Sequence, residues 1–378
     1  MKKLGFIIFF DAFAMMLLGT IIVMSASSTY SEFKFDNLFH LSNSHLVKVF
    51  FGLILMVVFS AVPYEYYKKF SKQAALAVVA MLVLTLLFAP SIKGAGRWIN
   101  LGIISFQPAD IARLVLIIHL AYLIEEKDEL LKDFRNGFRY LFLWVIIISG
   151  LILVQPNISN GVLLLVTCLV LLYVGGAKFL HILTSSLLCL VSGGIVAMIF
   201  SHSRGRILTF ISSFKHGGDI NIQVKQAILG LGSGGLLGVG IGHSRQSNLF
   251  LPEAYGDFIF AIYGEETGFI GSVFLLFCFI ILFAAGLLIA KKTKDKFGQL
   301  LAFGIIFSTV IYALVNIAVS IGLVPTTGLP LPFISYGGTS LIFLCISTGI
   351  LINIALTNAS KEQAALNVNT RQTNEVKL

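Results

Sequence analysis

The sequence FIFAIYGEETGFIGSVFLLFCFIILFAAGLLI, from Phe258 to Ile289, is a long apolar run that decides the fold class. A helix needs roughly 20 apolar residues to cross a hydrocarbon core of about 30 Å, so this run is long enough to span a membrane. Nine further runs share this character: Leu4 to Met24, Leu46 to Val62, Ala74 to Ala89, Ile111 to Ile124, Tyr140 to Val154, Val162 to Val174, Ile182 to Phe200, Leu300 to Ile321 and Ser340 to Leu356. The sequence therefore predicts an all-α polytopic membrane protein with about ten transmembrane helices.

The amino-acid composition is typical of an integral membrane protein. Of the 378 residues, 57% are apolar and 12% are charged, and this charged fraction is about half that of an ordinary soluble domain. The four cysteines all lie inside apolar runs and lack CxxC spacing, so they behave as small apolar side chains. The histidines show no metal-ligand spacing. No metal site is predicted.

Orientation follows from the basic residues between the runs, because short loops rich in Lys and Arg stay in the cytoplasm. With the N-terminus inside, the inner loops carry Lys68, Lys69, Lys72, Lys127, Lys132, Arg135, Arg139, Lys178, Lys291, Lys292, Lys294 and Lys296. Both termini are therefore predicted to be cytoplasmic. The net charge of +9 then reflects topology and contact with anionic lipid, and no nucleic-acid partner is indicated.

The domain organisation is simple, because most connecting loops are short. Residues 1–359 are predicted to form a single membrane domain without an attached soluble module. The outward segment from Ser201 to Asp257 is far longer, yet it lacks the low hydrophobicity and high charge of disorder. Within it, Ile222 to Leu231 has amphipathic helical spacing. We expect a large ordered extracytoplasmic loop between helices 7 and 8, and a flexible cytoplasmic tail over residues 360–378.

Four clusters of polar, glycine and proline residues face the outer side: residues 93–110, 155–157, 232–258 and 322–338. Irregular backbone and polar groups at membrane depth are tolerated only where they are buried in protein or line a wet cavity. Four such clusters on one side indicate a shared site. The glycines between 232 and 242 lack the ending of a nucleotide-binding loop, so close backbone packing against a helix or a lipid-linked substrate is the better interpretation.

Asp257 lies where the long outer loop enters an apolar helix. A carboxylate in that position can accept a proton from an attacking hydroxyl. Asp is also a good helix N-cap, and one residue can serve in both roles. Glu253, Glu265 and Glu266 compete for the role of base, although the last two lie deeper along the helix.

Asp110 and Arg113 are three residues apart on a predicted helix and face each other. One interpretation is an internal ion pair that neutralises two charges inside the bilayer. The other is that they position a substrate diphosphate or the catalytic carboxylate. The sequence alone leaves both open.

In this order, the clusters resemble the SEDS family of bacterial shape, elongation, division and sporulation proteins. The match covers nearly the whole chain, and its motifs are Met24-Ser25-Ala26-Ser27, Gly96-Arg97-Trp98-Ile99, Phe106-Gln107-Pro108, Gln155-Pro156, Gly232-Ser233-Gly234-Gly235-Leu236, Leu251-Pro252-Glu253, Asp257-Phe258-Ile259-Phe260, Glu265-Glu266 and Gly328-Leu329-Pro330-Leu331-Pro332-Phe333-Ile334-Ser335-Tyr336-Gly337-Gly338. Within the family, residues 242–246 and the unbroken Leu-Pro-Glu-Ala at 251–254 resemble FtsW, the septal member, more than RodA, the member that acts in elongation.

The resemblance implies a peptidoglycan glycosyltransferase that polymerises lipid II on the outer face of the cytoplasmic membrane during cell division. It implies two kinds of protein partner, a class B penicillin-binding transpeptidase and other divisome membrane proteins, and it places the protein at the septum. Asp257 matches the family's essential aspartate and would be the general base of an inverting transfer. The candidate residues for binding the diphosphate or sugar are Lys93, Arg97, Trp98, Gln107, Asp110, Arg113, Gln155, Arg204, Arg206, Arg245 and Glu253. No cofactor is implied with certainty, and the need for a divalent cation is left open.

Two places depart from the family's pattern. The family has Glu, followed three residues later by Lys, where this chain has Asp110 and Arg113; the charges are kept, but reach and hydrogen-bond geometry change. The family's Gln-Pro-Asp is Gln155-Pro156-Asn157 here, which removes a carboxylate. Any role of that carboxylate in substrate or metal binding is therefore in doubt for this chain.

Three other functions compete with this interpretation. A lipid II flippase is the rival transporter class, but few ionisable residues lie within the runs and no paired, interrupted spans mark two inverted halves. A RodA-type elongation polymerase shares the same motifs. A pure scaffold for the division machinery would leave Asp257 and the outer glycine loop without a reason.

Overall fold

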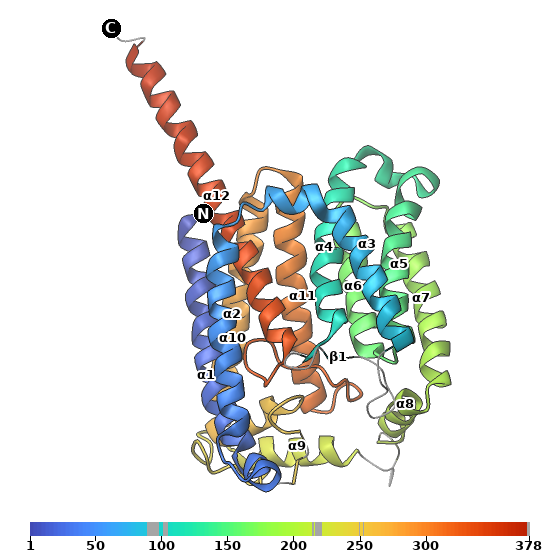
Figure 1. Cartoon of the computed structure of the whole chain (residues 1–378), viewed down its shortest axis with the longest axis vertical. Helices are drawn as coiled ribbons and strands as arrows, with labels where there is room; N and C mark the ends of the chain where they lie inside the picture. The colour runs from blue at the N-terminus through green and yellow to red at the C-terminus, as the bar shows by residue number, and fades with distance from the viewer. Residues whose placement is uncertain are drawn as a thin grey trace.

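The computed structural model describes residues 1–88, 98–100, 105–213, 215, 221–248, 250–251 and 253–375, and these residues form a helical bundle (Figure 1). Each predicted apolar run is a helix. The helices that carry these runs are α1 (Lys2–Phe35), α2 (His40–Ala61), α3 (Glu65–Phe88), α4 (Pro108–Glu126), α5 (Arg139–Val154), α6 (Ile158–Val174), α7 (Phe179–Ile199), α10 (Ile259–Lys292), α11 (Lys296–Ser320) and α12 (Thr339–Glu375).

The remaining elements are short. Two helices, α8 (Ser201–Ser213) and α9 (Ile222–Ser233), lie in the long loop, and η1 (Glu129–Lys132) and η2 (Phe134–Phe138) connect α4 to α5. A hairpin pairs β1 (Ile99–Asn100) with β2 (Ser105–Phe106), so that Ile99 faces Phe106. The prediction of an all-α membrane fold with an ordered loop before α10 is confirmed.

Seven segments are long and apolar enough to cross a membrane: α1, α2, α3, η2 with α5, α10, α11, and α12 as far as Ala364. Helices α6 and α7 are apolar but shorter over their described spans. The tenth helix, α4, carries Asp110, Arg113, Glu125 and Glu126 within 19 residues. Ten helices thus match ten predicted runs, and seven of them qualify by length and composition alone.

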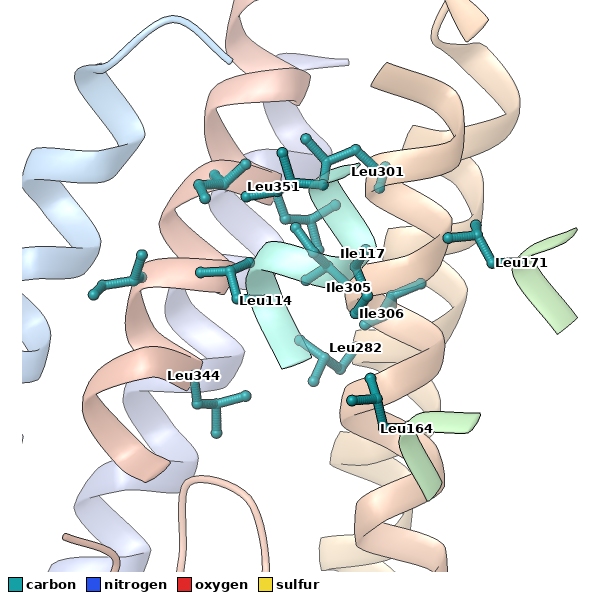
Figure 2. Packing of buried hydrophobic residues seen from close by; sticks show 14 of the residues in the cluster. Leu114, Ile117, Leu164, Leu171, Leu282, Leu301, Ile305, Ile306, Leu344 and Leu351 are labelled. Atoms are coloured by element: carbon teal, nitrogen blue, oxygen red, sulfur yellow. The ribbon is translucent and has the colours of Figure 1, made fainter. Parts of the chain in front are cut away.

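Helix α4 lies at the centre of the bundle. It packs against α3, α5, α6, α11 and α12. Leu114 and Ile117 of α4 share one buried cluster with leucines and isoleucines of α6, α10, α11 and α12 (Figure 2). A helix that is apolar all round is stable only when other helices surround it. The central position therefore buries Asp110 of α4, while Glu126 at the opposite end of the helix is exposed near the terminal face.

Several helices extend beyond their apolar runs. Helix α3 begins at Glu65 and not at Ala74, and α6 begins at Ile158 and not at Val162. Long polar side chains at a helix end bury their stems and keep their charged heads in water, so a helix need not stop where its apolar run stops. Helix α12 continues as far as Glu375 and projects from the bundle (Figure 1). The backbone of the predicted tail is therefore helical as far as Glu375, and the flexibility of the tail stays a prediction.

The bundle has two different faces. Both chain ends lie toward the same side (Figure 1), which we call the terminal face, and α8, α9 and the loop of residues 321–338 lie on the opposite side, the loop face. Ion pairs link helix ends on the terminal face: Lys68 with Glu125, Lys296 with Asp128, and Lys361 with Glu65. These pairs are partly exposed, so each contributes at most about 1 kcal/mol.

A kink in α10 shapes the loop face. Gly268 has φ 70° and ψ −167°, so the helical hydrogen bonds are interrupted there. The glycine loop of residues 234–242 supplies the missing partners: Phe269 N–H donates to the Gly235 carbonyl at 2.9 Å, and the Glu266 carbonyl accepts from Gly240 N–H at 3.0 Å. The sequence-based interpretation of close packing is confirmed for Gly234 and Gly238, where a Cβ would lie 2.3 Å from the Gly264 carbonyl oxygen and 2.1 Å from the Glu266 carbonyl oxygen. A Cβ on Gly232, Gly235 or Gly242 would meet no atom within 4 Å.

Replacement of Gly238 by Ala is expected to destabilise the fold by roughly 1–3 kcal/mol, because the Cβ would overlap α10 backbone. The matched control is Gly232→Ala, where the new Cβ meets no atom within 4 Å. Fluorescence-detected size-exclusion melting of both variants measures the difference. Equal melting temperatures for the two variants would contradict the packing described above.

Candidate active site

Asp257 lies in a tight turn just before α10, and this turn is bound to the loop between α11 and α12. Asn316 of α11 is buried, and its Nδ2 donates to the Asp257 carbonyl at 2.8 Å and to the Leu329 carbonyl at 2.7 Å. Ser335 Oγ donates to the Gly256 carbonyl at 2.7 Å. These bonds fix the backbone of Asp257 from two sides.

The helix begins after Asp257 and not at it. Ile259 is the first residue of α10, and Phe258 occupies the N-cap position. Asp257 thus stands one residue before the N-cap, and its side chain is half-buried. The position favours a role for the carboxylate other than capping this helix.

Arg206 of α8 lies beside Asp257. The Asp257 carboxylate oxygen Oδ2 and the Arg206 guanidinium nitrogen Nη1 lie 3.5 and 3.8 Å from the point where a Cβ on Gly328 would sit. Gly328 has φ 74°, a left-handed conformation that glycine adopts without strain. Nη1 also donates to the Thr326 carbonyl at 3.2 Å. The Asp257 carboxylate and the Arg206 guanidinium thus lie together beside the backbone of Gly328.

Two opposing effects act on the charge of Arg206. Burial lowers the pKa of the guanidinium, and the carboxylates of Asp257 and Glu253 act against that shift. Because an arginine in a protein stays protonated, the site presents a fixed positive charge next to a carboxylate. Glu253 itself is exposed and has φ 56°.

A largely apolar groove of about 560 Å³ runs between α6 and α7 and ends at Arg206. Leucine and valine side chains of α6 form much of its wall, together with Gly193 and Gly194 of α7. The stretch from Pro325 to Thr327 closes the end nearest Arg206. Asn157 lines the groove, is 5% exposed, and its Nδ2 has no hydrogen-bond partner within the described chain. The groove therefore offers an apolar channel with polar groups at one end.

Glu265 and Glu266 are structural residues. Both are 1% exposed. Glu265 accepts hydrogen bonds from Ser244 Oγ at 2.5 Å and from the N–H of Arg245 at 3.1 Å. Glu266 accepts from Ser25 Oγ of α1 and from Gly242 N–H. These carboxylates hold the loop before α10 in place, so neither is a good candidate for the catalytic base.

The region around the hairpin forms a second polar group on the loop face. The Asp110 carboxylate accepts from Thr339 Oγ1 at 3.1 Å, and the same hydroxyl accepts from the backbone N–H of Gln107 at 3.1 Å. Trp98 lies against Gly338. The guanidinium of Arg113 lies 4.4 Å from the ring centre of Tyr312. Asp110 and Arg113 are close enough to attract each other, but each also has a separate partner.

Other residues predicted for the site lie elsewhere or serve the fold. Gln155 is buried, and its Nε2 donates to the Leu82 carbonyl of α3 at 2.9 Å. Arg204 and Arg245 have exposed side chains. Lys93 and Arg97 lie outside the described residues. The structure thus brings Asp257, Arg206 and Glu253 together and gives Gln155 a packing role.

Sequence reasoning missed the residues that position Asp257. Asn316 is one polar residue within the apolar run from Leu300 to Ile321, and a buried amide in such a run signals a specific hydrogen bond. Thr339 follows the second of two glycines and resembled an ordinary helix start. No local pattern identifies either residue as part of the site.

The fold and the site define a polytopic membrane protein with a carboxylate and a guanidinium fixed at the end of a groove between helices. The family profile described as cell cycle protein, which covers FtsW, RodA and SpoVE, matches residues 6–360. The chain therefore belongs to this family, the SEDS family that its motifs resemble. The assignment covers the whole membrane domain.

Individual relatives agree with this assignment. The chain is 35% identical over 351 residues to the probable peptidoglycan glycosyltransferase FtsW of Coxiella burnetii, covering 90% of this chain and 93% of the relative. It is 34% identical to the stage V sporulation protein E of Bacillus subtilis, over 90% of this chain and 94% of that one.

Solved structures share the fold. A chain of the structure "Structural coordination of polymerization and crosslinking by a peptidoglycan synthase complex" superposes with a TM-score of 0.75 at 23% identity, covering 93% of this chain and 97% of that one. The crystal structure of the rod shape determining protein RodA of Thermus thermophilus superposes with a TM-score of 0.66 at 24% identity, covering 92% and 95%. The polytopic fold is thus common to these proteins.

Removal of the Asn316 amide tests the support of the Asp257 turn. Asn316→Ala leaves the buried Leu329 carbonyl and the partly buried Asp257 carbonyl without this donor. The loss at the buried carbonyl costs roughly 1–3 kcal/mol. We expect faster amide hydrogen exchange in residues 255–258 and 329–336, measured by mass spectrometry.

The matched control for this experiment is Asn353→Ala. Asn353 is a buried amide on α12 whose Nδ2 donates to the Ser60 carbonyl near the terminal face. The Asn353→Ala variant should be less stable than the wild type, but its amide hydrogen exchange at residues 255–258 should not be faster. The same exchange pattern in both variants would show that Asn316 does not position the turn.

Proposed function

We propose that this protein is a peptidoglycan glycosyltransferase that polymerises lipid II into glycan strands at the outer face of the cytoplasmic membrane. The observation that carries the proposal is the Asp257 carboxylate beside the Arg206 guanidinium at the end of an apolar groove. This arrangement suits a substrate with a long hydrocarbon chain, an anionic diphosphate and a sugar. The names of the FtsW relatives support the same activity.

The groove would hold the polyprenyl chain of the donor substrate. Apolar side chains of α6 and α7 line it, and a hydrocarbon chain loses no hydrogen bonds there. At its end, Arg206 and the unpaired Nδ2 of Asn157 offer a positive charge and a hydrogen-bond donor. Both would face the diphosphate. Asn157 thus supplies a donor where the family's pattern has an acceptor.

Asp257 would act as the general base. The 4-hydroxyl of the acceptor N-acetylglucosamine attacks the anomeric carbon of the donor N-acetylmuramic acid, and its proton passes to the Asp257 carboxylate. The bond between the anomeric carbon and the diphosphate oxygen breaks, with inversion at that carbon. The electron pair leaves with undecaprenyl diphosphate.

Arg206 would stabilise the negative charge that develops on the leaving group. A preorganised cation in a site with little water contributes several kcal/mol to such a step. Arg204 on the same helix, together with Lys93 and Arg97, would add to the positive field. Trp98, Gln107, Asp110, Arg113, Arg245 and Glu253 remain proposed contacts for the sugars or the diphosphate.

The described residues do not by themselves form a metal site. Among them, no group of three or more His, Cys, Asp or Glu side chains is placed to bind an ion. The sequence left the need for a divalent cation open, and titration of the activity with EDTA and Mg²⁺ tests it.

The proposed setting is the division septum, with both termini in the cytoplasm. The basic residues of the terminal face support this orientation, because short basic loops stay inside. A class B penicillin-binding transpeptidase and other divisome membrane proteins are the proposed partners. A fluorescent fusion that follows the lateral wall and avoids the septum would favour the elongation role.

Asp257→Asn is expected to reduce polymerisation of labelled lipid II by roughly 100-fold or more, because the amide cannot accept the proton. The assay uses the purified protein with its cognate transpeptidase. Asp36→Asn is the control, since it removes the same charge from an exposed position at the end of α1. Polymer from Asp257→Asn at the wild-type rate would refute the base, and no polymer from folded wild-type complex would refute the activity.

Gly194→Leu is expected to raise the KM for lipid II by roughly tenfold, because a leucine side chain would enter the groove. The effect should shrink with a short-chain lipid II analogue, which does not fill the groove. Gly150→Leu on α5 is the control, since Gly150 also has open space around its Cα and does not line the groove. The same KM increase for both chain lengths would show that the groove does not hold the chain.

A further inference from the structure

A second pocket, of about 530 Å³, opens at the terminal face between α3, α4 and the start of α5. It lies at the opposite end of the helices from Asp257. Four lysines line it, together with a single acidic residue, Glu126. These lysines are Lys68, Lys69, Lys72 and Lys127. A concave site with such an excess of positive charge attracts anions.

The lysines are only partly neutralised. Lys68 is paired with Glu125, and the Lys127 ammonium lies 5.1 Å from the ring centre of Tyr140. Lys69 and Lys72 are exposed and form no ion pair within the described part of the chain. The pocket therefore keeps cationic groups available for a ligand.

His119 supplies the second observation. It lines the pocket, is 1% exposed, and its Nδ1 lies 3.4 Å from Ser71 Oγ. Its other ring nitrogen, Nε2, is buried without a hydrogen-bond partner in the described chain. Buried polar atoms are nearly always paired in folded proteins. An unpaired ring nitrogen in a lysine-lined pocket indicates that a ligand supplies the partner.

The depth of the pocket identifies the class of ligand. Its lysines lie in the first turns of α3 and at the end of α4, where the helices reach the headgroup layer. Tyr122 and Tyr140 also line it, and tyrosine side chains favour this interface. Phosphate headgroups are the anions that lie at this depth, and basic pockets between helices on the cytoplasmic side bind them.

We propose that this pocket binds the phosphate headgroup of an anionic phospholipid. The lysines at 69, 72 and 127 neutralise the phosphate, while His119 Nε2 hydrogen-bonds to a headgroup oxygen. The acyl chains extend along the outside of α3, whose lipid-facing residues include Leu76 and Val83. The site is independent of the proposed transferase chemistry at the loop face.

The test measures lipid retention by the full-length protein in detergent, using native mass spectrometry. The probes are dioleoyl phosphatidylglycerol, dioleoyl phosphatidylcholine and inorganic phosphate. We expect selective retention of phosphatidylglycerol. The double variant Lys72→Gln with Lys127→Gln should bind it roughly 10- to 30-fold more weakly, since each lysine near the headgroup contributes a factor of about five.

The matched control is Lys132→Gln with Lys291→Gln. These lysines are exposed on the same face and do not line the pocket, so the control loses the same net charge and should bind as the wild type does. Equal binding by the two double variants would overturn the site. Equal retention of phosphatidylcholine, or complete displacement of the lipid by an equal concentration of inorganic phosphate, would overturn the anionic lipid as its occupant.

His119→Phe gives an independent measurement, because phenylalanine keeps an aromatic ring at this position and removes both ring nitrogens, Nε2 and the Nδ1 beside Ser71. It should weaken phosphatidylglycerol binding by a few fold while leaving the lysines in place. Melting curves without lipid show whether the variant folds. Unchanged affinity in a folded His119→Phe variant would overturn the role given to Nε2.

Discussion

Three buried polar side chains hold the non-helical backbone of the loop face: Glu265 and Glu266 of α10 and Asn316 of α11. Inside a bilayer, backbone that leaves the helical pattern must find its hydrogen-bond partners within the protein. Glu266 accepts from Gly242 of the glycine loop, Glu265 accepts from Arg245 just after that loop, and the amide donates to the turn at Asp257 and to Leu329. The placement of the irregular segments depends on these bonds.

The site follows from that constraint. The turn before α10 is tied to the loop after α11, and Asp257 and Arg206 lie together beside Gly328 of that loop. The same loop closes one end of the groove between α6 and α7. A carboxylate, a fixed cation and an apolar groove thus meet in one place, which suits the proposed transfer from a lipid-linked diphosphate. The terminal face has different chemistry, with ion pairs and a lysine-lined pocket.

Part of this arrangement could be read from the sequence. The ten apolar runs, the amphipathic α9 and the close packing of the glycines follow from local composition and spacing, and Asp257 was evident from its place at a helix entry. The roles of Gln155, Glu265 and Glu266 could not be predicted from the sequence. A buried polar residue looks the same in sequence whether its partner is a substrate or a polar group of a distant helix. Gln155 reaches α3, and Glu266 reaches Ser25 of α1.

The sequence by itself determined that this is a helical membrane protein of the SEDS family, since hydropathy acts residue by residue along each helix and the motifs are local. Tertiary structure alone decided which polar groups are partners. Asn316 lies 59 residues from Asp257, and Thr339 lies 229 residues from Asp110. Such pairs form only when helices pack, because burial removes water and leaves each polar group to the nearest partner that the bundle provides.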